Sequence, residues 1–131
     1  MKFYHCKACG NIIIMLENSG VKPVCCGKEM EELVPKTVDE AKEKHVPVIS
    51  CKEDGVVEVT IGEQLHPMTD EHYIKWIVLE TDKGKYIKNL KPGVDPIARF
   101  TLCKSEIPIT AYEFCNIHSL WGKTYEEENG C

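Results

Sequence analysis

The chain has 131 residues, of which 43% are hydrophobic and 28% charged, and its formal net charge is −5. This length suffices for one ordinary domain with a very small one beside it, but not for two full-sized cores. The acidic balance and the scattered lysines argue against a nucleic-acid-binding protein, and no apolar run approaches the roughly 18 residues of a membrane span. Because residues 1–6 also lack the pattern of a secretory signal, we expect a cytoplasmic protein with no membrane or nucleic-acid partner.

Residues 1–36 are predicted to form a small first domain, with four of the eight cysteines and one short apolar run at residues 12–16. So small a core requires a metal or disulfides to fold. The cysteines stand in two pairs, and each pair is followed by a glycine, which permits the positive φ of a tight turn. In a chain without a secretory signal this pattern indicates a metal site. The two pairs read Cys6-Lys7-Ala8-Cys9-Gly10 and Cys25-Cys26-Gly27.

Four thiolates are the ligand set of tetrahedral zinc or of a single iron. Cys6 and Cys9 have ordinary CxxC spacing, whereas the adjacent Cys25 and Cys26 cannot spread their sulfurs as comfortably. We therefore expect a distorted tetrahedron. The spacing alone leaves iron and a structural zinc equally open, with a disulfide arrangement as the weaker alternative.

Residues 36–47 are polar and lack a sustained apolar stripe, which predicts a linker with at most a helical turn. The second domain, residues 37–131, contains short runs of β-branched and aromatic residues separated by turn signals. Apolar and polar residues alternate from Val57 to Ile61, as in a strand with one buried face. Cys51 and Cys103 fall within predicted strands, where a free cysteine packs as a small hydrophobe. Seven strands fit an all-β sandwich, and we place them at residues 48–52, 56–61, 73–81, 85–90, 98–103, 109–114 and 120–126.

Four of the five histidines lie in the second domain, each in a loop or at a predicted strand end. A rigid sandwich can bring side chains together at such positions. Taken singly, each histidine is more simply explained as a surface or hydrogen-bonded residue. Taken together with a nearby cysteine, they predict a metal site. Its candidate ligands are His45, His66, His72, Cys115 and His118.

Five ligands exceed the four that a structural zinc takes, and this excess favours iron. Four imidazoles in a plane and one axial thiolate would leave the opposite axial position open for a small molecule. A thiolate pushes electron density onto iron, as in thiolate-ligated haem enzymes, and so favours oxygen chemistry. A copper site built from two histidines, one cysteine and Met68 would leave two histidines unused.

The segments around these ligands resemble the superoxide reductases, and the four-cysteine segment resembles the desulforedoxin-like domain of the desulfoferrodoxin subgroup. The resemblance covers essentially the whole chain and departs at no ligand position. It implies a small metal-stabilised desulforedoxin-like domain followed by a seven-stranded immunoglobulin-like β-sandwich. It also implies a homodimer with two irons per subunit, zinc being the alternative in the four-cysteine site. The segments that carry it are Glu43-Lys44-His45-Val46-Pro47-Val48, His66-Pro67-Met68, His72-Tyr73-Ile74 and Cys115-Asn116-Ile117-His118.

By this resemblance the protein reduces superoxide to hydrogen peroxide by one electron, without producing dioxygen, at a ferrous iron with an open axial position. Lys44 would attract superoxide and organise a protonating water, and Glu43 would occupy the sixth position of ferric iron after turnover. The simpler alternatives are a solvated lysine and a surface carboxylate. The implied electron donor is a rubredoxin-like protein. Two other functions compete: a two-iron electron carrier without a catalytic role, and a zinc-stabilised binding module.

Overall fold

The computed structural model describes residues 1–37 and 42–127, and the side chains of residues 42 and 43 lie outside this description. The chain divides into two compact units, Met1–Val34 and Pro35–Cys131. Strands form almost all of the regular structure in the described ranges, where the helical elements are single turns, α1 (Lys42–His45) and the 3-10 turn η1 (Glu53–Gly55). No helix within these ranges is long and apolar enough to cross a membrane.

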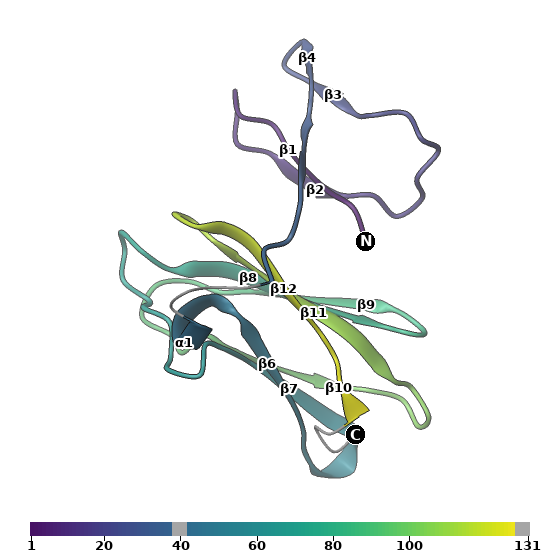
Figure 1. The fold of residues 1–131 in the computed structure, drawn as a ribbon, viewed down its shortest axis with the longest axis vertical. Helices are drawn as coiled ribbons and strands as arrows, with labels where there is room; N and C mark the ends of the chain where they lie inside the picture. The colour runs from purple at the N-terminus through teal and green to yellow at the C-terminus, as the bar shows by residue number, and fades with distance from the viewer. Residues whose placement is uncertain (38–41, 128–131) are drawn as a thin grey trace. The chain divides into compact units, whose positions relative to one another are not determined.

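The first unit consists of short strands around a very small core (Figure 1). Tyr4, Cys6 and Met30 are buried together, and Cys25 packs against them. Two of the four candidate metal ligands, Cys6 and Cys25, thus lie in or against this small apolar cluster, as expected for a domain that needs a metal to fold. One sheet has the order β2-β1-β5 and the other pairs β3 with β4. The strands are β1 (Phe3–His5), β2 (Ile12–Ile14), β3 (Val24–Cys25), β4 (Lys28–Glu29) and β5 (Glu31–Leu33).

The second unit contains seven strands in two antiparallel sheets, which Figure 1 shows as two layers. The three-stranded sheet has the order β10-β7-β6, and the four-stranded sheet has the order β12-β11-β8-β9. The predicted all-β, seven-stranded sandwich is therefore confirmed. The strands are β6 (Pro47–Cys51), β7 (Val56–Ile61), β8 (Ile74–Thr81), β9 (Lys85–Asn89), β10 (Ile97–Thr101), β11 (Pro108–Cys115) and β12 (Ser119–Thr124).

One hydrophobic core joins the two sheets. Val57, Val59 and Ile61 of β7 are buried in it, whereas Glu58 points to the outer face and accepts a hydrogen bond from Arg99 Nε at 2.9 Å. Each fully buried aliphatic side chain contributes about 1.5–3 kcal/mol relative to an exposed one. The alternation predicted for these strands is confirmed, and it fixes which face of each strand is buried.

Antiparallel pairing brings the ends of neighbouring strands together at one end of each sheet. Pro47 at the start of β6 pairs with Ile61 at the end of β7. Ile74 at the start of β8 pairs with Cys115 at the end of β11, which pairs in turn with Ser119 at the start of β12. The connections that carry the candidate ligands leave the sheets at these ends.

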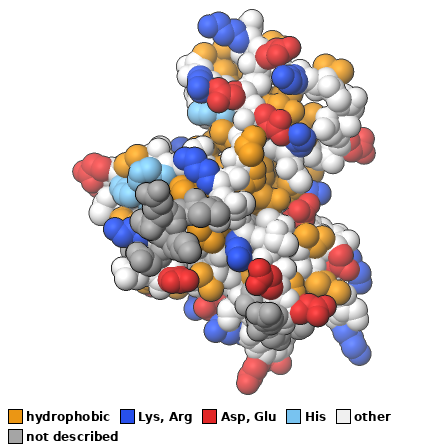
Figure 2. Space-filling model, in the orientation of Figure 1, with side chains coloured by type: hydrophobic (Ala, Val, Ile, Leu, Met, Phe, Trp, Pro, Cys, Tyr) orange, Lys and Arg blue, Asp and Glu red, His pale blue; other side chains and the backbone are white. Residues whose placement is uncertain are grey.

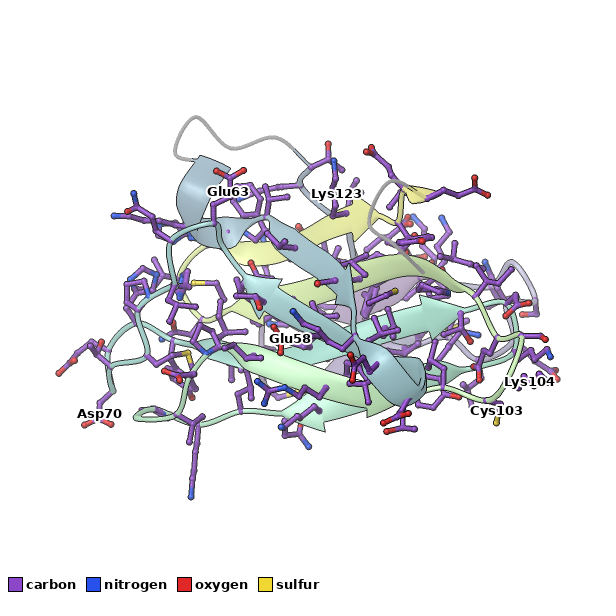
Figure 3. All side chains as sticks on the ribbon, turned by 90° about the horizontal axis from the view of Figure 1, so that it is seen from below. Glu58, Glu63, Asp70, Cys103, Lys104 and Lys123 are labelled. Atoms are coloured by element: carbon purple, nitrogen blue, oxygen red, sulfur yellow. The ribbon has the colours of Figure 1, made fainter. Side chains whose placement is uncertain are left out.

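Two cysteines of the second unit do not behave as predicted. Cys51 ends β6 and is disulfide-bonded, so its assignment as a free thiol is wrong, although it does pack against the core. β10 ends at Thr101, and Cys103 therefore lies beyond the buried alternation as an exposed free thiol. Figure 3 shows Cys103 at the opposite end of this unit from Asp70, which belongs to the connection between β7 and β8.

Candidate metal centres

The four cysteines of the first unit form one cluster in space. Their sulfur atoms all lie within 4.8 Å of one another. Cys9 Sγ is 3.6 Å from Cys25 Sγ, and Cys25 Sγ is 4.0 Å from Cys26 Sγ. Sulfurs held at about 2.3 Å from a common tetrahedral metal lie about 3.8 Å apart. The cluster therefore fits a single tetrahedral ion.

Two tight turns present these sulfurs. In the first, the N–H of Gly10 donates to the carbonyl of Cys6 at 2.8 Å, and Gly10 has a φ of 86°. In the second, Cys26 and Gly27 have φ values of 53° and 74°, and the chain reverses between β3 and β4. Left-handed backbone at Cys26 lets two neighbouring cysteines share one centre, and the following glycines serve the turns as predicted.

Crowding among the sulfurs opposes the ionisation of Cys25 and Cys26 in the absence of a cation. Hydrogen bonds among the sulfurs, that of Cys9 first, raise the pKa of Cys26 to about 12. The pKa of Cys6 is lowered to about 7, chiefly by a backbone hydrogen bond from Cys9. A bound metal takes the place of the thiol protons and removes this conflict. The donor set fits iron and zinc alike.

The four histidines of the second unit surround a common centre. The ring centroids of neighbours are 4.9 Å apart for His45 and His66, and 4.5 Å apart for His66 and His72. They are 5.1 Å apart for His72 and His118, and 4.6 Å apart for His118 and His45. His45 and His72, which face each other across this arrangement, are 6.4 Å apart. The four distances between neighbouring rings are similar and the distance across is longer, so the imidazoles form a square.

Cys115 lies beside these imidazoles. The possible ligand atoms of His45, His72, His118 and Cys115 all lie within 4.8 Å of one another. Cys115 Sγ is 3.8 Å from His118 Nδ1, which in turn is 2.9 Å from His45 Nε2. The structure thus brings together all five ligands that the sequence predicts for this site, with His66 completing the square through its ring contacts.

Two of the buried ring nitrogens at this site make no hydrogen bond within the described residues. Nε2 of His66 and Nε2 of His72 have no hydrogen-bond partner in the described part of the chain. His66 Nδ1 donates to the carbonyl of Pro67 at 2.7 Å, which leaves Nε2 with a free lone pair. Buried polar atoms without a partner are rare in native proteins. A metal ion at the centre of the square satisfies both nitrogens.

Burial keeps the imidazoles of His66 and His72 in the form that binds metal. Desolvation lowers the pKa of His66 to about 4, and it also lowers the pKa of His72, so both imidazoles are neutral at neutral pH. Burial raises the pKa of Cys115, while hydrogen bonds from the N–H groups of His118 and Ile117 to its sulfur lower it. Neutral imidazoles with one thiol are the donors of a d-block metal.

Local turns hold each ligand in place. His45 is the last residue of α1. The N–H of His66 donates to the carbonyl of Ile61 at 3.1 Å. His118 lies in the three-residue connection between β11 and β12, and Ser119 follows it with a φ of 68°. A left-handed residue after a three-residue turn is a common hairpin geometry.

Several residues outside the predicted set support the ligands. Asn116 joins the two ligand-bearing connections, because its Oδ1 accepts from the N–H of Tyr73 at 2.9 Å and its Nδ2 donates to the carbonyl of Glu71 at 3.0 Å. Trp121 stacks on His45 with centroids 4.8 Å apart. Such second-layer contacts orient metal ligands. The CxxH motif contains Asn116, but no sequence signal gives its pairing with the other connection.

Lys44 and Glu43 are the two predicted catalytic residues, and they directly precede His45 in the chain. Lys44 is exposed beside His45, and its charge is among the smaller causes that lower the pKa of His72, which places it near the imidazoles. The side chain of Glu43 lies outside the described part of the structure. Figure 2 shows histidine side chains reaching the surface of the larger unit, with a Lys or Arg side chain beside them.

The copper alternative fits the structure less well. Met68 Sδ accepts a hydrogen bond from the N–H of Ile74 at 3.3 Å, and the side chain packs against the hydrophobic core. Four imidazoles, rather than two, face the centre. The arrangement corresponds to the five-ligand site and not to a trigonal copper site.

Both units match families of known proteins. Residues 1–33 match the family model of the desulfoferrodoxin N-terminal domain, and residues 37–124 match that of desulfoferrodoxin. The desulfoferrodoxin of Syntrophotalea carbinolica is 44% identical over 121 residues, which are 92% of this chain and 94% of that protein.

Solved structures show the same fold. The superoxide reductase from Treponema pallidum superposes with a TM-score of 0.81 and 33% identity over 94% of this chain and 97% of that one. The superoxide reductase from Giardia intestinalis, designated 1Fe-SOR, has a TM-score of 0.55 and 32% identity over 65% of this chain and 99% of that one. By family models that span both units and by close full-length relatives, the chain belongs to the desulfoferrodoxin family.

Proposed function

We propose that the protein is a superoxide reductase, which converts superoxide to hydrogen peroxide with one electron and two protons and releases no dioxygen. The observation that carries this proposal is the square of four imidazoles beside one buried thiol, with two ring nitrogens that lack a partner among the described residues. Two structural relatives named as superoxide reductases support it. The proposed iron ligands are His45, His66, His72, His118 and Cys115.

An iron held by these five residues would supply the electron and, with only five protein ligands, would still have room to bind a small molecule. Cys115 is fully buried, so its sulfur closes the protein side of the site, whereas His118 is exposed. Superoxide therefore arrives from the solvent side. Lys44 beside His45 attracts the anion and holds a water that delivers a proton. Glu43, adjacent to Lys44, is proposed to bind the iron once it is oxidised.

The four-cysteine cluster, the first centre in chain order, is proposed to hold an iron of its own through Cys6, Cys9, Cys25 and Cys26, with zinc as the alternative; the histidine site is the second centre. Its tetrahedral sulfur set suits an electron-transfer iron as well as a structural ion. A rubredoxin-like protein is the proposed electron donor, and the proposed assembly is a homodimer in the cytoplasm. Metal analysis separates the two ions: two irons per chain support the proposal, and one zinc with one iron assigns zinc to this cluster.

An electron carrier without catalytic activity is the competing function, and it needs no open coordination position. Azide added to the oxidised protein distinguishes the two. A reductase binds azide at the second centre, so the absorption of that centre shifts while the spectrum of the four-cysteine centre stays constant. Saturating azide without any shift would favour the electron carrier.

A further inference from the structure

The first residues of the second unit add a short strand segment next to the histidine site. Lys36 forms an isolated parallel bridge with Trp121. Its N–H donates to the carbonyl of Leu120 at 2.9 Å, and its carbonyl accepts from the N–H of Gly122 at 2.9 Å. β12 is an edge strand of its sheet, and this segment covers part of that edge. The backbone of Lys36 is thus fixed beside the ligand-bearing hairpin.

The side chain of Lys36 reaches that hairpin directly. Its Nζ donates to the carbonyl of His118 at 3.0 Å, and the same carbonyl accepts from Nε1 of Trp121 at 3.1 Å. The ammonium also lies 5.2 Å from the centroid of the Trp121 ring, within the range of a cation–π contact. One positive charge therefore touches the peptide of a proposed iron ligand and an aromatic side chain.

The aromatic side chain extends this contact to a second ligand. Trp121 stacks on His45 with an interplanar angle of 19°. Lys36 and Trp121 together fix the His118 carbonyl and brace the His45 ring, which are on two neighbouring sides of the imidazole square.

We propose that Lys36 is a positioning residue of the iron centre, which holds the Cys115–His118 loop and Trp121 against the ligands and places a positive charge beside the metal. The inference rests on the proposed function for the identity of the metal. It assigns a role to a residue that precedes every ligand of the site in the chain and belongs to none of its motifs. Residues of this kind, which orient ligands without binding the metal, change metal affinity about 10–100-fold when they are replaced.

The alternative is that only the backbone of Lys36 matters, because its two main-chain hydrogen bonds already fix the segment to β12. Lys36→Met separates the two cases, since it keeps both main-chain bonds and the apolar stem but removes the charge and the donor. Lys36→Arg restores both. Lys123→Met is the matched control, because Lys123 lies on β12, the strand that Lys36 adjoins, is exposed, and has its Nζ 3.6 Å from a carboxylate oxygen of Glu126. Figure 3 labels Lys123 at the surface.

The test uses the full chain loaded with iron and measures three quantities for the second centre: the thiolate-to-iron absorption band, the reduction potential and the rate of iron loss to a chelator. Lys36→Met should shift the band, lower the potential and release iron roughly tenfold faster. Lys36→Arg should recover most of each change, and Lys123→Met should match the wild type. The four-cysteine spectrum should be constant throughout, which reports correct folding of the first unit.

A Lys36→Met protein indistinguishable from Lys123→Met in all three quantities would overturn the inference. If Lys36→Met fails to fold, Lys36→Gln takes its place, since it keeps a polar side chain while it removes the charge. The proposed function can fail without the inference. If the wild-type protein does not react with superoxide but Lys36→Met still loses iron faster, the proposed function is wrong and the positioning role of Lys36 stands.

Discussion

Cys115 is fully buried at the end of β11, and its sulfur receives hydrogen bonds from the N–H groups of His118 and Ile117. A thiolate bound to ferric iron absorbs visible light through charge transfer, and amide hydrogen bonds tune that transition. The same sulfur lies in the hydrophobic core that joins both sheets. The side chain of Cys115 therefore affects both the electronic properties of the site and the packing of the sandwich.

Cys115→Ser tests this assignment. A serine oxygen cannot supply the thiolate transition, so the visible band of the second centre should disappear. The band of the Cys6, Cys9, Cys25 and Cys26 cluster should persist, because its ligands come from the other unit. The absorption spectrum of the oxidised variant measures both bands. Survival of both would show that Cys115 is not a ligand.

Glu113 lies two residues before Cys115 on the same strand, and its carboxyl group is fully buried. Neither of its oxygens has a hydrogen-bond partner in the described ranges. Burial raises the pKa of this carboxyl well above its ordinary value, so the folded protein holds a proton here at a higher pH than the unfolded chain does. A neutral Glu113 is also favourable for Cys115, because a charged carboxylate at this position would oppose the thiolate.

Glu113→Gln should raise the free energy of unfolding at pH 7, because an amide does not need to be protonated on folding. The folded-state pKa is above the unfolded value, so the stability of the wild type is fullest below the unfolded pKa of about 4.3 and falls as pH rises toward the folded-state pKa. The advantage of the variant should therefore narrow from pH 8 to pH 5. Urea unfolding across this range measures it.

The control for Glu113 is Glu63→Gln, because Glu63 is an exposed residue of the same unit. It should change the free energy of unfolding little at any pH. An advantage of Glu113→Gln that is constant with pH would mean that Glu113 has the same protonation state in the folded and unfolded chains.

The connections between strands are constrained as closely as the strands themselves. Gly55 ends η1 between β6 and β7 with a φ of 74°, and its carbonyl accepts from the N–H of Leu102 at 2.9 Å. A Cβ at this position would lie 3.0 Å from the carbonyl oxygen of Leu102. Gly93 has a similar φ of 89°, but a Cβ there would meet no atom within 4 Å. Comparing substitutions at the two glycines therefore separates the cost of backbone strain from the cost of a steric contact.

Gly55→Ala should destabilise the protein more than Gly93→Ala. Both substitutions force a residue with a side chain into the left-handed region, at a cost of about 1–2 kcal/mol. Gly55→Ala must also move backbone that joins β10 to the rest of its sheet, which adds about 1 kcal/mol or more. Thermal or urea unfolding of the two variants measures the difference. Equal losses would mean that the contact with Leu102 is easily relieved.

Periodicity and turn chemistry predict most of the elements. The alternation from Val57 to Ile61 gives both the strand and its buried face, and the observed strand ends differ from the predicted ones by at most two residues. Cys103 shows the limit of this reasoning, because alternation does not say where a strand stops. Lys36 shows another limit, since its bridge to Trp121 joins residues far apart in sequence and no local pattern encodes it.

At the scale of the whole molecule, the two metal sites draw their ligands from separate compact units. Ligand types and their positions at strand ends suffice to predict both clusters. The ligand count allowed a planar set of four imidazoles to be anticipated, but the distances between the rings could not be predicted, because they depend on the registers that pair Pro47 with Ile61 and Ile74 with Cys115. The sequence thus predicts which residues form the sites, whereas the distances between those residues depend on how the sheets are paired.

Cys9→Ser tests whether the two centres act independently. It removes one exposed sulfur of the first cluster, so the absorption of that cluster should be lost or strongly altered. The reduced second centre should still react with superoxide within about twofold of the wild-type rate, because its ligands belong to the other unit and independent sites without shared partners behave additively. Stopped-flow absorption of the second centre measures this rate. A tenfold loss would show that the first cluster takes part in the reaction with superoxide.

The central claim is that the chain reduces superoxide at the site of His45, His66, His72, His118 and Cys115. The most direct measurement mixes the reduced protein with a pulse of superoxide and follows oxidation of the second centre together with hydrogen peroxide and dioxygen. Reduction predicts one peroxide for each superoxide consumed, in step with oxidation of that centre, and no dioxygen. A reduced centre that does not react, or dioxygen formed alongside peroxide, would contradict the account.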